Sequence, residues 1–249
     1  MQLHVRINIP KPISLPIDCH YMMRAAIYNS IKHVYPEYGS FIHDKGYYYK
    51  NRPFKPFTFS VLRGIGVQNG DFCTYERNVD FRIRSVEPFF IHAIKKSIAE
   101  NKLQIGSVKF DDIDLEISNP TVESQEIRIR TCSPICVRKT LTGDGQKEGT
   151  IAFGPNSDVF YSSIKDNFKR EYEAVYGEPP DSDIEILFFP GTAKKNEIEV
   201  DRDKEKSYRV IVYDGEFLLK GDRKYLDFLY QTGLGEKTAL GCGMFDIIT

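Results

Sequence analysis

The chain has 249 residues, of which 41% are hydrophobic and 28% charged, and its formal net charge is −1. This length allows one large domain or two of ordinary size. No apolar run approaches the roughly 18 residues of a membrane span. The first residues lack the basic start and apolar core of a signal peptide, so a cytoplasmic protein is expected. The near-zero net charge argues against strong, indiscriminate binding of polyanions, and any nucleic-acid site should be a confined basic surface.

The cysteines do not form the pattern of a metal site or a disulfide framework. Only two of them lie close together, and no histidine or second cysteine pair completes a zinc-binding set. We therefore expect buried thiols, no bound metal and no cofactor. The five positions are Cys19, Cys73, Cys132, Cys136 and Cys242.

The first half of the chain alternates between strand and helix patterns. Residues 2–9 alternate in hydrophobicity like a strand, and residues 19–34 show apolar spacings of three and four, typical of a helix. A loop rich in Tyr, Gly and Pro is expected over 35–53. Strands are predicted over 57–67 and 81–86, with a hairpin-like Asn-Gly-Asp turn between them, then a helix over 88–101 and a strand over 108–118.

The second half repeats this order more loosely. It predicts a strand over 126–137, a helix over 157–177, strands over 182–190 and 207–219, a helix over 217–230 and a last strand at 244–248. The order β-α-β-β-α-β is that of a ferredoxin-like unit. We therefore predict an α+β protein of two tandem ferredoxin-like domains, covering 1–120 and 121–249.

Two sets of acidic residues alternate with apolar ones, and they could serve a two-metal nuclease. The complete alternation favours carboxylates on the solvent face of a strand instead. The sets are Asp112, Asp114 and Glu116, and Asp181, Asp183 and Glu185.

The segment GLGEKTALGCG, residues 233–243, holds four glycines around Lys237. It follows a predicted helix and precedes a strand, so it is neither a P-loop nor a dinucleotide-binding fingerprint. Its backbone N–H groups could approach a phosphate chain, with Lys237 adding charge. Tight packing of helix, loop and strand explains the same pattern equally well.

Three further groups suggest RNA binding. His43 lies in the Tyr-rich loop among several cations, and a histidine is the usual proton donor or acceptor in catalysis; cations and aromatic rings suit the phosphates and bases of RNA. Tyr28 shares a helix face with Arg24 and Lys32. The third group comprises Arg128, Arg130, Arg138 and Lys139. These residues form either a charged edge strand or a basic surface that follows a nucleic-acid backbone.

The glycine-rich segment resembles the glycine-rich loop of the RAMP superfamily of CRISPR-associated proteins. More narrowly, the whole chain resembles the repeat-processing endoribonuclease family known as CRISPR-associated protein six. The resemblance includes RAAIYNSIKH at 24–33, FIHDKG at 41–46, KPFTFSVL at 55–62, CSPICVRK at 132–139 and YSSIKDNFKREYEAVYGEPP at 161–180.

This resemblance implies two ferredoxin-like domains and a metal-independent endoribonuclease. Members of the family cut CRISPR precursor transcripts within each repeat and leave a 5′-hydroxyl and a 2′,3′-cyclic phosphate. Their catalytic tyrosine, histidine and lysine correspond to Tyr28, His43 and Lys55, with Lys50 or Arg52 as alternatives to the lysine. Which of Tyr28 and His43 is the base and which the acid stays open.

The resemblance also implies an RNA-binding role for the glycine-rich loop, at Gly233, Gly235, Lys237, Gly241 and Gly243. The partner is then CRISPR repeat RNA; subunits of a CRISPR interference complex and a second copy of the chain are further candidates. The alternative function is a non-catalytic RNA-binding subunit with the same fold. The presence of His43 favours the enzyme.

Overall fold

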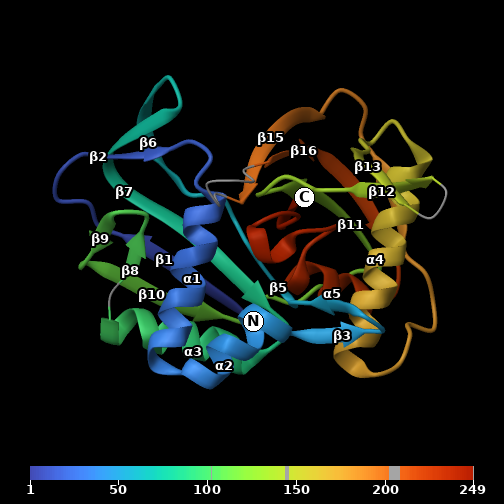
Figure 1. Ribbon diagram of the computed structural model, residues 1–249, viewed down its shortest axis with the longest axis horizontal. Coiled ribbons are helices and arrows are strands. Elements are labelled where there is room, and N and C mark those ends of the chain that lie inside the picture. The colour runs from blue at the N-terminus through green and yellow to red at the C-terminus, as the bar shows by residue number, and fades with distance from the viewer. Residues whose placement is uncertain (102, 144–145, 202–207, 249) are drawn as a thin grey trace.

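The computed structural model describes residues 1–101, 103–143, 146–201 and 208–248, and consists of two α+β halves side by side (Figure 1). The elements of the first half are β1 (Gln2–Ile7), β2 (Ile13–Pro16), α1 (His20–Val34), α2 (Pro36–Ser40), a π-helix (Phe41–Lys45), β3 (Tyr47–Tyr49), β4 (Arg52–Phe54), β5 (Phe57–Phe59), β6 (Arg63–Asn69), β7 (Phe72–Ser85), α3 (Pro88–Asn101), β8 (Leu103–Ile105), β9 (Val108–Phe110) and β10 (Ile113–Ser118). Those of the second half are β11 (Glu126–Thr131), β12 (Arg138–Gly143), β13 (Gln146–Ala152), α4 (Asp158–Tyr176), β14 (Glu185–Phe188), β15 (Lys194–Asp201), β16 (Tyr208–Asp214), β17 (Glu216–Lys220), α5 (Arg223–Thr232), a 3₁₀ turn (Thr238–Leu240) and β18 (Phe245–Ile248).

Strand order shows that each half is a ferredoxin-like unit. In the first sheet β10, β1, β7 and β5 lie side by side, and α1 and α3 connect them. In the second sheet the order is β14, β17, β11 and β18, with α4 and α5 as the connecting helices. Numbered within each unit, both sheets have the antiparallel order 4-1-3-2. The predicted α+β fold of two tandem ferredoxin-like domains is confirmed.

Each half buries its own apolar side chains. Met23, Ile27 and Ile31 of α1 pack onto the first sheet, which explains the predicted spacing of three and four. Phe160 and Ile164 of α4 belong to a separate cluster on the second sheet. These two cores agree with two domains, while the boundary between residues 120 and 121 stays a prediction.

The prediction of a loop over 35–53 is wrong in detail, because this segment contains α2, the π-helix, β3 and β4. The π-helix ends at Gly46, whose backbone N–H donates to the carbonyl of Phe41 at 2.8 Å. Residue Gly46 has a φ of 73°, and a Cβ there would lie 2.4 Å from the carbonyl oxygen of Phe54. Close packing against β4 therefore orders a segment whose composition is typical of a loop.

The start of the helix predicted over 217–230 is also wrong. Residues up to Lys220 form β17, because Phe217 and Leu219 alternate into the core and the backbone pairs with β11 and β14. The helix α5 begins only after Asp222. The strand predicted over 57–67 divides into β5 and β6, and the one predicted over 207–219 divides into β16 and β17. The strands β12, β13 and β15 were not predicted.

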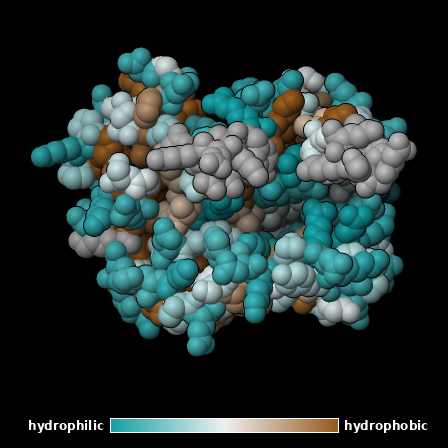
Figure 2. All heavy atoms as spheres, in the orientation of Figure 1, coloured by the Kyte–Doolittle hydropathy of each residue, from teal (hydrophilic) through white to brown (hydrophobic). Residues whose placement is uncertain are grey.

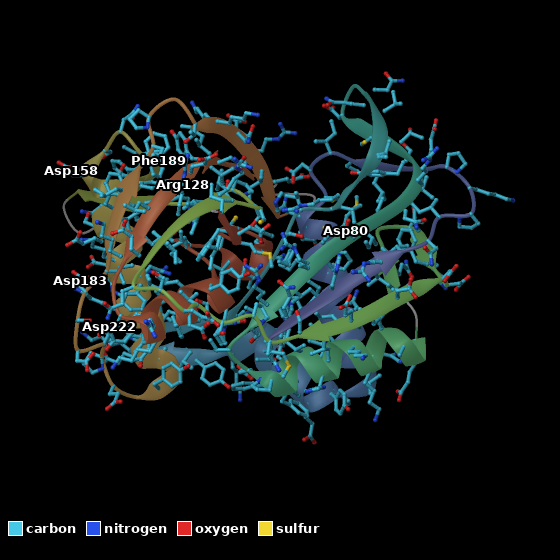
Figure 3. The ribbon with its side chains drawn as sticks, turned by 180° about the vertical axis from the view of Figure 1, so that it is seen from behind. Asp80, Arg128, Asp158, Asp183, Phe189 and Asp222 are labelled. Atoms are coloured by element: carbon cyan, nitrogen blue, oxygen red, sulfur yellow. The ribbon has the colours of Figure 1, made fainter. Side chains whose placement is uncertain are left out.

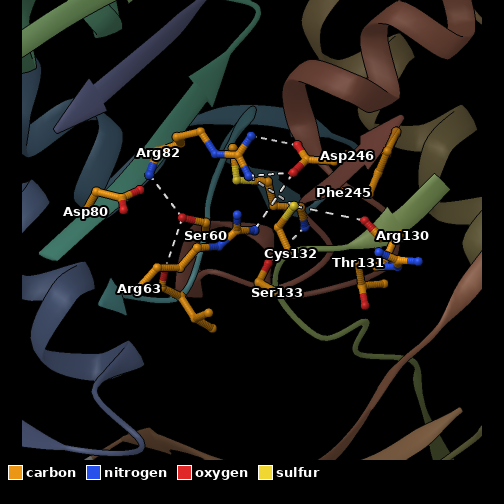
Figure 4. A network of polar contacts seen from close by, with 12 residues as sticks. Ser60, Arg63, Asp80, Arg82, Arg130, Thr131, Cys132, Ser133, Phe245 and Asp246 are labelled. Atoms are coloured by element: carbon orange, nitrogen blue, oxygen red, sulfur yellow. Dashed lines mark hydrogen bonds and ion pairs between the residues drawn. The ribbon is translucent and has the colours of Figure 1, made fainter. Parts of the chain in front are cut away.

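A buried ion-pair network joins the two halves (Figure 4). Both guanidinium nitrogens of Arg82 donate to the carboxylate of Asp246, at 2.6 and 2.7 Å. Arg84 donates to the same carboxylate at 3.1 Å and to the carbonyl of Phe245 at 2.6 Å, and its side chain is fully buried. Since the arginines belong to β7 and Asp246 to β18, these bonds hold the two sheets in a fixed relation.

The face shown in Figure 2 is mostly polar, and apolar side chains gather on it over β2, β6 and β7. Exposed apolar residues of this region include Ile17, Ile65, Val67 and Phe72. None of the described helices has both the length and the apolar composition needed to cross a membrane.

Candidate active site

A cleft of about 1240 Å³ lies between the two halves and draws its walls from both. The first half contributes α1, the π-helix and β4, and the second contributes β12, α4, β16 and the glycine-rich loop. Basic side chains outnumber acidic ones among the lining residues, so the near-neutral chain concentrates cations here. The basic residues are Arg24, Arg52, Lys55, Arg138, Lys139, Arg170, Arg209 and Lys237, and the acidic ones are Asp166, Glu171 and Glu236.

Tyr28 forms the buried floor of one end of the cleft. It follows the apolar stripe of α1, and only 6% of the residue is exposed. Its ring packs edge-on against His43, with 4.9 Å between ring centroids, and against Phe57 at 5.9 Å. Burial raises the pKa of the Tyr28 hydroxyl far above its ordinary value. The phenol is therefore protonated at neutral pH and acts as a hydrogen-bond donor.

His43 lies on the π-helix, above the ring of Tyr28 and open to solvent. Its Nδ1 is 2.6 Å from the Asp44 carboxylate. The hydrogen bond from His43 holds the pKa of the Asp44 carboxyl below its ordinary value. A carboxylate bonded to Nδ1 makes that nitrogen the donor and leaves Nε2 as the acceptor of a neutral ring. The ring thus presents a proton-accepting nitrogen beside the cleft.

Lys55, which directly follows β4, is the third member of this group. Its Nζ donates to the backbone carbonyl of His43 and lies 5.4 Å from the centroid of the Tyr28 ring. Burial, and then the positive charge of Arg24, lower the pKa of the Lys55 ammonium. An ammonium with a lowered pKa gives up its proton more readily than an exposed lysine.

The two alternative cations are placed differently. Lys50 is exposed near the ring of Tyr49 and does not line the cleft. Arg52 lines the cleft but hydrogen-bonds to Asn167 and Glu236 in the second half. Lys55 is the one of the three that contacts both Tyr28 and His43, so the geometry favours it.

The predicted RNA-binding side chains divide into two groups. Arg138, Lys139 and Lys237 line the cleft with Tyr28 and His43. Arg128 and Arg130 do not line it.

Instead, both of these arginines share one face of β11, as the alternation predicts, and pair with the carboxylate of Glu216 at 2.7 Å. Arg128 also lies over the ring of Phe189 at 4.4 Å (Figure 3). These two arginines form a separate surface on the second sheet.

The glycine-rich loop is buried more deeply than a phosphate-binding loop needs to be. Its four glycines are all buried and all have a positive φ. A Cβ on Gly243 would lie 2.1 Å from the carbonyl oxygen of Leu234, and one on Gly235 would lie 2.6 Å from that of Cys136. Packing thus requires glycine at both positions. Of the four, Gly235 lines the cleft, next to Glu236 and Lys237.

The acidic residues considered as metal ligands lie away from this cleft. Asp112 directly precedes β10 and its side chain accepts a hydrogen bond from Asn8, and Glu116 on β10 pairs with Arg6 at 2.9 Å. Asp181 and Asp183 precede β14 rather than lying on a strand, and they pair with Lys224 and Lys169. Within the described ranges, no three His, Cys, Asp or Glu side chains are grouped as metal ligands.

Several cleft residues gave no signal in the sequence. Asn167 and Glu171 lie one turn apart on α4, where a helical pattern predicts only which face they occupy. Arg209 lies in the strand predicted over 207–219, but the pairing of that strand with β15 was not predicted. Arg24 shares the face of Tyr28 as expected, and its charge acts on Lys55.

A family model described as CRISPR associated protein Cas6, C-terminal, matches residues 117–247. The chain is also 30% identical to the CRISPR-associated endoribonuclease Cas6 1 of Methanocaldococcus jannaschii, over 98% of this chain and 91% of that protein. The chain belongs to the Cas6 family.

Other similarities extend over the whole Cas6 chain. The CRISPR-associated endoribonuclease Cas6 of Pyrococcus furiosus is 24% identical, over 95% of this chain and 85% of its own length. A solved structure described as characterization of a Cas6-related gene from Pyrococcus furiosus has a TM-score of 0.82 at 21% identity, covering 100% of this chain and 98% of the other. The structural likeness supports the fold, and the sequence relatives establish the family.

Proposed function

We propose that this protein is a metal-independent endoribonuclease that binds CRISPR precursor transcripts and cleaves them within each repeat. The observation that carries the proposal is the mutual contact of Tyr28, His43 and Lys55 at one end of a basic cleft. The names of the sequence relatives, CRISPR-associated endoribonucleases, support RNA cleavage as the activity. A cleft lined by cations suits a phosphate backbone.

The chemistry follows from the protonation states of the three side chains. Nε2 of His43 accepts the proton of the ribose 2′-hydroxyl while the 2′-oxygen bonds to the adjacent phosphorus. The bond from phosphorus to the 5′-oxygen breaks, and the leaving oxygen receives a proton, which Lys55 can supply. The products are a 2′,3′-cyclic phosphate and a 5′-hydroxyl. Tyr28 stays protonated and donates a hydrogen bond to the phosphate, so His43 takes the role of base.

Charge stabilisation is shared between the two halves. The phosphorane carries additional negative charge, which the ammonium of Lys55 and the neighbouring cations of the cleft offset. Lys237 approaches from the glycine-rich loop, and its charge already acts on Lys55. The reacting phosphate therefore has to contact side chains from both domains at once.

The test is a cleavage assay on end-labelled repeat RNA in excess EDTA, with a parallel substrate that carries one 2′-deoxy sugar at the mapped cut. We expect cleavage in EDTA, and we expect the deoxy sugar to block it because the nucleophile is missing. Tight binding without cleavage would instead indicate an RNA-binding subunit. A requirement for added magnesium would overturn the metal-independent mechanism.

Lys237→Met is expected to weaken binding of the uncleavable deoxy RNA by about 3- to 10-fold. Loss of one phosphate contact should also reduce the slope of log K against log salt by about 0.7 for a single strand. Filter binding at several salt concentrations measures both quantities. Arg130→Met is the comparison, because Arg130 lies outside the cleft and is paired with Glu216. An unchanged affinity and salt slope for Lys237→Met would remove Lys237 from the RNA path.

A further inference from the structure

The two residues assigned to proton transfer flank a single short hairpin. His43 lies on the π-helix that ends at Lys45, Gly46 joins that helix to β3, and Lys55 directly follows β4. The strands pair Tyr47 with Phe54 and Tyr49 with Arg52. The end of the π-helix packs against Phe54, as described above. This packing fixes the position of His43 relative to Lys55. Any movement of the hairpin would therefore move both groups together.

This β3–β4 hairpin extends from the first half to the second half of the molecule. In Figure 1 β3 reaches toward α4, and the two elements are in contact. On this side the hairpin faces the second domain through the contact of β3 with α4. Its position relative to the second domain therefore depends on contacts made across the cleft.

Arg52 makes those contacts with directional bonds. Its Nη2 donates to Oδ1 of Asn167 at 3.0 Å and to Oε1 of Glu236 at 3.2 Å. Asn167 is almost fully buried, and its Nδ2 donates to the carbonyl of Gly235 at 2.7 Å. The amide is thus held from both ends, and its oxygen can only face Arg52. Glu236 is also held, because Arg138 lies 3.6 Å from its other oxygen.

A second carboxyl beside Arg52 does not compete for it. Glu171 lies one turn beyond Asn167 on α4 and is 2% exposed. Burial, opposed by the charge of Arg52, raises the pKa of Glu171 to about 8. Glu171 is therefore mainly protonated at neutral pH, and Glu236 is the carboxyl group that pairs with Arg52.

We propose that Arg52 is a positioning residue, which docks the β3–β4 hairpin onto Asn167 and Glu236 and so aligns His43 and Lys55 with the phosphate-binding side chains of the second domain. This inference rests on the proposed endoribonuclease function. Without this inference, Arg52 would be interpreted as one of several basic residues that bind phosphate. Both bonds come from Nη2, which the long, planar arginine side chain places between the two acceptors, whereas the shorter lysine side chain ends about one bond length earlier.

If Arg52 aligns the catalytic groups, its loss should lower the rate of RNA cleavage without lowering the affinity for RNA. Arg52→Met and Asn167→Ala should each lower the single-turnover cleavage rate at saturating protein by about 10- to 100-fold, since small misplacements of reacting groups have effects of this size. The Kd for the 2′-deoxy repeat should stay within about threefold. The double variant should be little slower than either single variant, because both remove the same network.

Arg52→Lys separates positioning from direct contact with a phosphate. If the role of Arg52 were only to bind a phosphate, Arg52→Lys would bind and cleave RNA like the wild type. Asn167→Ala would then also behave as the wild type. That pair of results would overturn the proposal. We expect Arg52→Lys to stay at least about fivefold slow, because the shorter side chain does not bring its ammonium to the position of Nη2 between the two acceptors. Lys169→Met is the matched control, since it removes a cation of α4 that pairs with Asp183 and should leave the rate unchanged.

Hydrogen exchange gives a readout that does not depend on cleavage. Amides of residues 43–55 should exchange faster in Arg52→Met and Asn167→Ala than in Lys169→Met, and unchanged exchange would contradict the docking role. A wild type that does not cleave would refute the proposed function, and the exchange result would still decide the role of Arg52. If Arg52→Met does not fold, Arg52→Lys and Asn167→Ala carry the same comparison.

Discussion

His43→Ala is expected to lower the rate of repeat cleavage by about 10²- to 10⁴-fold, because it removes the group that accepts the 2′-hydroxyl proton. Affinity for the 2′-deoxy repeat should stay within about threefold. The ring of His43 is exposed and contacts Tyr28 and the neighbouring Asp44, neither of which is a cation, so its removal should leave the cations of the cleft in place. Single-turnover kinetics and filter binding on the same preparation measure the two effects.

His33→Ala is the matched control, since His33 is an exposed histidine in the last turn of α1, the helix that carries Tyr28. It should cleave at the wild-type rate. Added imidazole should partly restore His43→Ala, because the small base can occupy the vacated space beside Tyr28. Cleavage by His43→Ala at more than about a tenth of the wild-type rate would show that another group takes the proton.

The architecture could be predicted because it depends on patterns that are local in the chain. The apolar spacing of α1 and α4 and the alternation in β1 and β11 each bury one face, and their order is that of two ferredoxin-like units. The start of α5 could not be predicted in this way. Phe217 fits a helical spacing and a strand equally well, and only pairing of β17 with β11 and β14 decides between them.

The candidate residues of the site could be selected from the sequence, but their contacts could not. Tyr28, His43 and Lys55 were selected through the resemblance to the family, and the structure brings them together. The sequence did not distinguish Lys55 from Lys50 and Arg52, because the choice depends on how the β3–β4 hairpin folds. The partners of Arg52 lie 115 and 184 positions away in the chain, where no local pattern reaches.

The glycine-rich loop shows how one motif can combine two requirements. Buried neighbours leave no space for a Cβ on Gly243, so packing alone accounts for that glycine. The turn between Gly235 and Gly241 nevertheless brings Glu236 to Arg52 and places Lys237 in the cleft. Packing thus holds the loop in the conformation that presents these two side chains to the cleft.

Asp246→Ala is expected to lower the free energy of unfolding by about 3 kcal/mol, the lower end of the range for breaking a buried ion pair, because a third of the Asp246 side chain is exposed. The substitution leaves the fully buried Arg84 without a carboxylate partner. Urea unfolding followed by circular dichroism measures the loss. Glu116→Ala is the control: it breaks an exposed pair with Arg6 and should cost less than about 1 kcal/mol.

The pH dependence of the same variant tests whether charge is the cause. Burial raises the pKa of the Asp246 carboxyl, but the hydrogen bonds from Arg82 and Cys132 and the charges of Arg82 and Arg84 together outweigh burial and bring that pKa below its ordinary value. A lowered folded-state pKa means that the contribution is complete above the unfolded value of about 3.9 and is lost as the pH falls below it toward the folded value. The difference between wild type and Asp246→Ala should therefore be constant near neutrality and shrink in acid. A difference that did not change with pH would show that Asp246 holds the two sheets together by packing alone.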